Sequence, residues 1–317
     1  MSLNIHEEIR RNRIKSVFII GLFFVFVAFL GAAAGTILSM SYTGDVFNIQ
    51  SILISVGVAM FISIIYILIF MGIGSNMILS STGAKEASRE HYPHLYHSTE
   101  ALSIAAGLRT PPKCYIIEDP SLNAYATGFS PEKSYVVVTT GLIKKLNRQE
   151  LEGVIAHEIA HIKNYDIRIM LLAAGLVGAT VFIADFLFRM FIFGGHGGGG
   201  GGGNKDGRVM IFIFVFYFVL IITAPIVAQL IKLAISRRRE YLADATGAQL
   251  TRYPEGLASA LEKIKGDPDP MIERANNATA HLFISNPFRK KKVGLSSLFS
   301  THPPIEERIA ILRGQKK

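Results

Sequence analysis

The chain has almost none of the residue that builds disulfides and thiolate metal sites. Its 317 residues include one cysteine, Cys114. A single cysteine excludes an intramolecular disulfide, and it also excludes a zinc site built from several thiolates. We therefore interpret Cys114 as a core residue, because a lone free cysteine is usually buried among apolar side chains.

Charged residues are also scarce. Asp, Glu, Lys and Arg together make up 18% of the chain, whereas hydrophobic residues make up 50% and the mean hydropathy is +0.36. The formal net charge is +9, but most basic residues flank apolar runs and do not alternate with aromatic residues on one face. This arrangement is typical of membrane-orientation signals and argues against nucleic acid as a partner. The partner that it predicts is a lipid bilayer.

The chain contains several long apolar runs. After a polar segment at 1–16, uncharged runs extend from Val17 to Leu38 and from Ile52 to Ile73. Each is long enough to cross a bilayer, and the first is too long for the apolar part of a signal peptide. We expect residues 17–74 to form a transmembrane hairpin.

Residues 166–236 contain two more apolar runs, Ile167 to Phe193 and Met210 to Ile235. A glycine tract at 194–203 joins them as a flexible connector. The two runs predict a second transmembrane hairpin, which brings the total to about four spans. A membrane-embedded hairpin that does not cross fully is the alternative.

Basic residues lie before the first run and after the second and fourth runs. Because positive charge is retained on the cytoplasmic side, we expect both termini there, in a multi-pass protein of the cell membrane. Residues 1–16, 75–165 and 237–317 would then share the cytoplasmic side.

The segment 147–161 carries the strongest chemical motif. His157-Glu158-Ile159-Ala160-His161 reads H-E-x-x-H, and Asn147 with Glu150 predicts a capped helix start just before it. Residues four apart share a helix face, so both imidazoles can bind one metal ion. Glu158 lies beside them, where it can accept a proton from an attacking water.

A hydrolytic zinc site needs three protein ligands, so a third must come from elsewhere in the chain. The candidates are Glu240, Asp244, His196, His281 and His302. Glu240 and Asp244 are four apart on a predicted helix that follows the fourth run. We favour Glu240 as the ligand and Asp244 as the acceptor that fixes the tautomer of a ligand histidine. Pairing of both acids with Arg237–Arg239 is the alternative.

Two further contributions to catalysis are expected from the residues. His302 and Arg308 are candidates for the donor that stabilises an oxyanion; helix capping and a surface cation are the alternatives. A peptide substrate needs an extended groove, and an exposed edge strand can bind it by backbone pairing. Asn123–Thr127 or Ser134–Thr140 could form that edge, although either could also be internal.

The fold class that we expect is a mainly α integral membrane protein with a small antiparallel sheet. The sheet is predicted from three short extended segments, at Cys114–Ile117, Asn123–Thr127 and Ser134–Thr140. Together with the motif helix they would form a zincin-like α+β catalytic domain on the transmembrane helices. Residues 75–165 and 237–317 would each supply part of this domain.

The chain resembles the HtpX-type membrane zinc metalloproteases, which are relatives of the CAAX prenyl proteases. The segments that carry the resemblance are Glu118-Asp119-Pro120, Asn123-Ala124-Tyr125-Ala126-Thr127-Gly128, Thr139-Thr140-Gly141-Leu142, residues 150–161, Arg239-Glu240-Tyr241-Leu242-Ala243-Asp244, and Thr301-His302-Pro303-Pro304 with Arg308. The resemblance implies one zinc ion per chain with Glu240 as third ligand. It also implies a cytoplasmic site that degrades damaged or misfolded membrane proteins.

The same resemblance implies contact with substrate near Asn123. We accordingly expect Asn123, Ala124, Tyr125 and Arg308 to contact the substrate. Two other function classes remain open: a membrane chaperone or adaptor with a structural zinc, and a metal transporter whose pathway is marked by Asp185 and Arg189. Glu158 favours the protease, because a structural zinc site needs no carboxylate beside its histidines.

Overall fold

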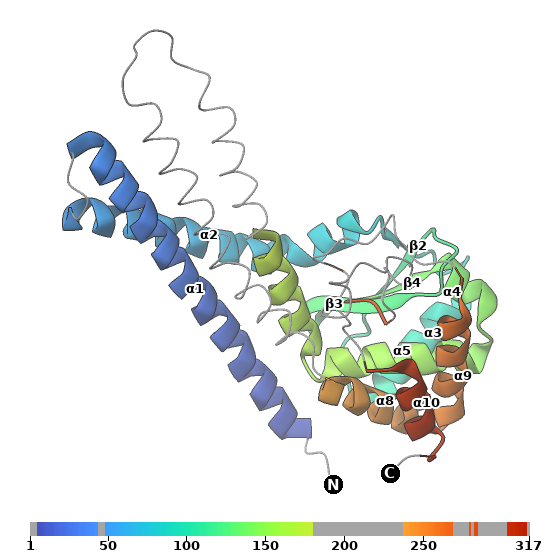
Figure 1. The fold of residues 1–317 in the computed structure, drawn as a ribbon. Coiled ribbons are helices and arrows are strands. Elements are labelled where there is room, and N and C mark those ends of the chain that lie inside the picture. Colours follow the sequence, from blue (N-terminus) through green and yellow to red (C-terminus); the bar gives the residue numbers. More distant parts are fainter. Residues whose placement is uncertain are drawn as a thin grey trace. The chain divides into compact units, whose positions relative to one another are not determined.

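The structure is a computed structural model that describes residues 5–43, 48–179, 237–268, 279, 282–284 and 303–315 (Figure 1). The chain divides into two compact units. One unit comprises Met1–Ser16, Ile73–Leu172 and Leu233–Lys317, and the other comprises Val17–Gly72 and Ala173–Lys232.

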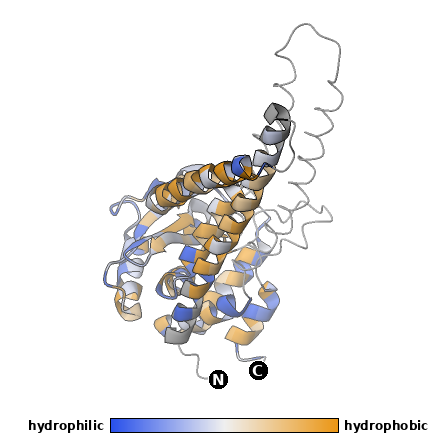
Figure 2. Cartoon of the chain, turned by 90° about the vertical axis from the view of Figure 1, so that its left-hand side faces the viewer, coloured by the Kyte–Doolittle hydropathy of each residue, from blue (hydrophilic) through white to orange (hydrophobic). Residues whose placement is uncertain are grey.

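Two long helices contain the candidate membrane spans of the described residues. They are α1 (Ile5–Thr43) and α2 (Ile49–Ser81), with spans at Ile14–Thr36 and Ile49–Ser81 of mean hydropathy 2.8 each. Figure 2 shows hydrophobic residues along most of both helices. The predicted run at 210–235 and most of the run at 167–193 lie outside the described residues.

Within the second unit, α1 and α2 approach each other at a pair of glycines. A Cβ atom on Gly31 would lie 2.8 Å from Val56 Cα, and one on Gly35 would lie 2.7 Å from Ile52 Cα. Only glycine permits backbones this close, and two glycines four residues apart are typical of helix pairs packed in membranes. The helices that contain the first two apolar runs therefore pack closely against each other.

The first unit contains a four-stranded sheet. Its strands are β1 (Lys85–Glu86), β2 (Lys113–Ile117), β3 (Ala124–Ser130) and β4 (Lys133–Thr139), in the order β1-β2-β4-β3. β1 pairs with β2 and β3 with β4 in antiparallel fashion, but β2 and β4 are parallel. The sheet is mixed, so the prediction of an antiparallel sheet was wrong.

The reason for the difference is the insertion of β4 between its neighbours. β3 and β4 form a hairpin, as expected for strands separated by a short turn. β4, and not β3, then pairs with β2, so two strands with the same direction meet. Four consecutive residues at the end of β4 are buried, as in a strand covered on both faces. Strand order of this kind is set by tertiary packing, and the alternation of residue types along a strand does not encode it.

Six further labelled helices belong to this unit. They are α3 (Pro93–Ala106), α4 (Thr140–Lys145), α5 (Arg148–Lys163), α8 (Arg237–Thr251), α9 (Pro254–Gly266) and α10 (Ile305–Leu312). α5 lies between the sheet and the pair α8 and α9, and it contacts α3, β3, α8 and α9 (Figure 1). Cys114 on β2 is fully buried, which confirms its role as a core residue, and burial raises the pKa of its thiol to about 11.

The predicted capping box begins α5. Asn147 Oδ1 accepts the Glu150 N–H at 2.9 Å, and Glu150 Oε2 accepts the Asn147 N–H at 2.7 Å. Every residue from Gly153 to Ile162 is buried. α5 and α9 cross closely, since a Cβ atom on Gly153 would lie 2.6 Å from Leu257 N. The motif helix is therefore the central helix of the unit.

Candidate metal centre

The two histidines of the H-E-x-x-H motif meet on one face of α5. His157 is 1% exposed and His161 is 4% exposed, and their Nε2 atoms are 3.1 Å apart. The helical spacing of four residues produces this approach, because it stacks the two side chains one turn apart. Two imidazole nitrogens directed at one point are suited to a shared metal ion.

Glu240 on α8 completes the set. Its Oε1 lies 3.5 Å from His161 Nε2, and its Oε2 lies 3.8 Å from His157 Nε2. The ligand atoms of the three residues all lie within 4.8 Å of one another. Tetrahedral zinc with bonds of about 2.0–2.2 Å places its ligand atoms about 3.3–3.6 Å apart. The three side chains therefore fit a zinc ion with little rearrangement.

Asp244 lies one turn after Glu240 and binds the other nitrogen of a ligand. Its Oδ1 is 2.9 Å from His157 Nδ1. A proton shared with the carboxylate at Nδ1 leaves Nε2 of His157 free to bind metal. This contact has the arrangement expected of an acceptor that fixes the tautomer of a ligand histidine.

Arg308 on α10 is fully buried and binds the same carboxylate. Its Nε donates to Asp244 Oδ2 at 2.8 Å and its Nη2 donates to Asp244 Oδ1 at 2.7 Å. Burial alone would raise the pKa of Asp244, but the Arg308 charge and the hydrogen bonds from Arg308 and His157 lower it to about 2. Asp244 is therefore ionised, and its charge is balanced by a guanidinium held in a two-bond pair.

Sequence reasoning missed Asp166. Its Oδ2 lies 3.0 Å from His161 Nδ1, so it does for His161 what Asp244 does for His157. The chain turns sharply between them, with Tyr165 at a φ of 60°, and this turn directs Asp166 back to α5. An acid five residues after the second histidine, at the start of an apolar run, is the signal that could have revealed it.

Three carboxylates act electrostatically on His161. Burial lowers its pKa, but the hydrogen bond to Asp166 and the carboxylates of Glu240, Asp166 and Glu158 raise it to about 9. A site with this excess of carboxylates favours a cation between its side chains. Glu158 itself is 2% exposed, and it also acts electrostatically on Arg308, whose pKa it helps to raise.

Three of the four residues predicted to contact substrate lie at the start of β3 or directly before it, and β3 is an edge strand of the sheet. Of the two candidate edges, β3 is at the edge and β4 is internal. Asn123 and Ala124 are buried, and the Ala124 carbonyl accepts a hydrogen bond from Ile284 N at 2.9 Å. The Tyr125 side chain is fully buried, with its hydroxyl 2.7 Å from Thr82 Oγ1.

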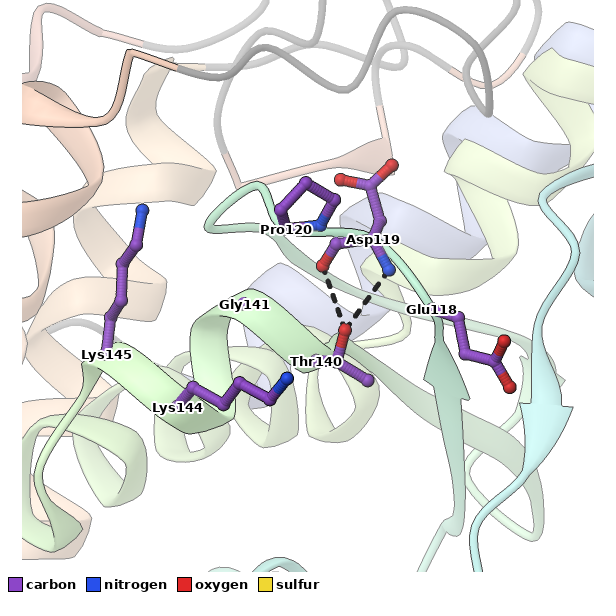
Figure 3. Close-up of a pocket in the computed structure, with 7 residues that line it drawn as sticks. All are labelled: Glu118, Asp119, Pro120, Thr140, Gly141, Lys144 and Lys145. Carbon is purple, nitrogen blue, oxygen red and sulfur yellow. Dashed lines mark hydrogen bonds between the residues drawn. The ribbon is translucent and has the colours of Figure 1, made fainter.

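The remaining histidine candidates fall on other parts of the chain. His302, His196 and His281 lie outside the described residues. Figure 3 shows a separate pocket of about 340 Å³. Its lining residues are Glu118, Asp119, Pro120, Thr140, Gly141, Lys144 and Lys145. None of them belongs to the metal centre, and their charges are mixed, so we assign this pocket no role.

Comparison with known proteins identifies the family of this chain. Residues 91–316 match the model of peptidase family M48. The chain belongs to that family. It is 52% identical over 239 residues to a "Protease HtpX homolog" of Dictyoglomus turgidum, covering 75% of each chain. A homolog from Streptococcus uberis is 41% identical over 309 residues, covering 98% of this chain and 99% of its own length.

These matches confirm the resemblance to the HtpX proteases. The protein is a membrane zinc metalloprotease of that group, with His157, His161 and Glu240 as its zinc site. Among solved structures, the crystal structure of S. mikatae Ste24p is similar with a TM-score of 0.43 and 19% identity. That similarity covers 83% of this chain and 65% of the Ste24p chain.

Proposed function

We propose that this protein is a zinc-dependent endopeptidase that hydrolyses peptide bonds of misfolded or damaged membrane proteins, with Glu158 as the general base. The observation that carries the proposal is the convergence of two imidazoles and the Glu240 carboxylate, together with a buried Glu158 on the same helix that acts electrostatically on His161. A structural zinc site in a chaperone or adaptor would have no use for the additional carboxylate of Glu158. The proposal includes one zinc ion per chain.

Residues of the chain itself carry out the proton transfers of the proposed hydrolysis. Zinc, when bound, would polarise the scissile carbonyl and acidify a water molecule. Glu158 accepts the proton of the attacking water and passes it to the leaving amine. Asp244 and Asp166 meanwhile keep His157 and His161 in the tautomer whose Nε2 faces the metal.

Arg308 has two proposed roles, which the contacts support unequally. Its guanidinium is fully buried and pairs with Asp244, and its Nη1 lies 3.8 Å from Glu240 Oε2. These contacts support a role in fixing Asp244, which positions a zinc ligand. Direct contact between Arg308 and the substrate stays a prediction. We propose His302 as the donor that stabilises the oxyanion.

The substrate is proposed to enter along β3. The Ala124 carbonyl already accepts a hydrogen bond from Ile284 N, so we propose that a peptide adds to the outer side of β3 beyond Ala124, as a further strand adds to a sheet edge. Asn123 directly precedes this strand and Ala124 and Tyr125 begin it, and the strand also contacts the motif helix α5. The proposed cytoplasmic location of the site follows from the basic residues that flank the apolar runs.

Glu158→Gln tests the proposal, measured with detergent-solubilised full-length protein and casein as an unfolded substrate. Loss of the base should reduce cleavage about 10²–10⁴-fold, while zinc content stays at the wild-type value. Glu152→Gln is the matched control, because Glu152 lies on the same helix and pairs with Arg148 at the surface. Cleavage at the wild-type rate by metal-loaded Glu158→Gln would show that the assigned mechanism is wrong.

A further inference from the structure

Asn12 is a buried polar residue near the start of α1. It precedes the first candidate span, and its side chain is 1% exposed, whereas Arg10 and Ile14 are exposed. A buried amide is costly unless hydrogen bonds replace its contacts with water. The partners of Asn12 therefore explain why an amide is present at this position.

Both hydrogen bonds of the Asn12 amide nitrogen lead to the end of the motif helix. Nδ2 donates to the carbonyl of Asn164, the C-cap of α5, at 2.9 Å and to Asp166 Oδ1 at 2.8 Å. The other oxygen of Asp166 lies 3.0 Å from His161 Nδ1. A continuous chain of side chains thus runs from the N-terminal segment to a zinc ligand.

Asp166 has another group within reach. Arg239 Nη1 lies 3.6 Å from the same Oδ1 that Asn12 binds. Asp166 is 1% exposed, so water cannot replace a lost partner. Without Asn12, the carboxylate would gain by rotating toward the guanidinium of Arg239, and this rotation would lengthen its hydrogen bond to His161. Asn12 opposes the rotation because it holds Oδ1 in place.

We infer that Asn12 is a positioning residue for the zinc site, acting through Asp166 on the orientation of His161. The segment before the first span is then part of the support of the metal centre, although more than 140 residues separate it from the motif. The inference rests on the zinc site at His157, His161 and Glu240, and it does not depend on the role of Glu158.

Asn12→Leu tests the inference in full-length protein in detergent, because leucine has a similar size and no donor. The zinc Kd, measured by competition with a chelator, should rise about tenfold. The visible absorption of the Co²⁺-substituted protein should change as well, since a displaced His161 alters the coordination geometry. Ile14→Ala is the control, because Ile14 is exposed and lies two residues further along the same helix. It should change neither the zinc Kd nor the visible absorption of the Co²⁺-substituted protein.

A double-substitution cycle separates positioning from a general loss of stability. In an Asp166→Asn background, Asn12→Leu should weaken zinc binding no further, because its effect passes through the Asp166 carboxylate. An unchanged Kd in Asn12→Leu overturns the inference. An equal loss of affinity in both backgrounds also overturns it, because the effect would then be independent of Asp166.

Folding is checked on the same samples by circular dichroism and unfolding temperature. Asn12→Ala removes the same donor without adding volume, and it replaces Asn12→Leu if the larger side chain prevents folding. A folded variant with a lower unfolding temperature and wild-type zinc affinity would assign Asn12 a structural role and refute the inference. Failure of the proposed peptidase mechanism would appear in Glu158→Gln cleavage and would leave these zinc measurements unaffected.

Discussion

At the scale of single residues, two buried carboxylates hold the ligand histidines, and each carboxylate has its own partner. Asp244 binds His157 and is paired with Arg308, whereas Asp166 binds His161 and is paired with Asn12. Such partners of the ligands typically change metal affinity 10–100-fold when they are replaced. The zinc site therefore extends well beyond its three ligands.

Arg308→Met should destabilise the protein by about 3–5 kcal/mol, because it leaves the Asp244 carboxylate buried without its cation. The measurement is the unfolding temperature of the purified protein in detergent. Adding Asp244→Asn to Arg308→Met should recover part of the loss, since the uncompensated charge is then removed. A surface cation would contribute little to stability. A destabilisation below about 0.5 kcal/mol in Arg308→Met would therefore contradict the role given to Arg308.

The two carboxylates also differ in how far the sequence reveals them. Asp244 was predicted, because it lies four residues after Glu240 and helical periodicity puts both on one face. Asp166, which directly precedes the apolar run that begins at Ile167, was missed. Its contact with His161 depends on the left-handed turn at Tyr165, which no residue pattern predicted. A β-turn or helix-end residue other than glycine or asparagine at positive φ is rarely foreseen.

At the scale of elements, the junction between α5 and α9 holds the motif helix in place. Glu150 Oε1 accepts the Ser259 hydroxyl at 2.7 Å, and its Oε2 accepts Lys263 Nζ at 2.7 Å. Burial disfavours the charged carboxylate, but the bonds from Lys263, Ser259 and the Asn147 N–H more than offset this, so the pKa of Glu150 is lowered. One residue thus caps α5 and links it to α9.

Glu150→Gln should lower the free energy of unfolding by about 1–3 kcal/mol at pH 7, because glutamine keeps the capping box and loses the charge. A lowered carboxylate pKa stabilises the fold above the unfolded pKa, near 4.3, and this stability is lost as the pH falls through the folded pKa. The difference between variant and wild type should therefore shrink below about pH 4.3.

The check is thermal or denaturant unfolding of both proteins at several pH values from 7 downward. Glu152→Gln provides the control, because the Glu152–Arg148 pair lies at the surface and should contribute at most about 0.5 kcal/mol. A difference for Glu150→Gln that stays constant with pH would exclude an electrostatic origin.

At the scale of the whole molecule, the zinc ligands come from parts of the chain that are far apart in sequence. His157 and His161 lie on α5, and Glu240 lies on α8, with residues 164–236 between the two helices. An ion bound by all three joins these helices. Because the unfolded chain cannot present the three ligands together, zinc binding stabilises the folded state.

Removal of zinc with a chelator should therefore lower the unfolding temperature. At a free zinc concentration about 100 times Kd, the bound ion contributes about 2.7 kcal/mol to stability. Glu240→Ala should lower the zinc content and abolish the response to the chelator. An unchanged zinc stoichiometry in Glu240→Ala would place the third ligand elsewhere.

The sequence by itself determined the local features, because these depend on residues that are close along the chain. The capped motif helix, the spacing of His157 and His161 and the long apolar helices α1 and α2 all follow from periodicity and end signals. The family also follows from short motifs taken together. Tertiary structure alone decided the order of the strands, the contact of Asp166 with His161 and the hydrogen bonds of Asn12 to Asn164 and Asp166. These features join segments that are distant in sequence, and each is set by packing and by the need to satisfy buried polar groups, which no local pattern specifies.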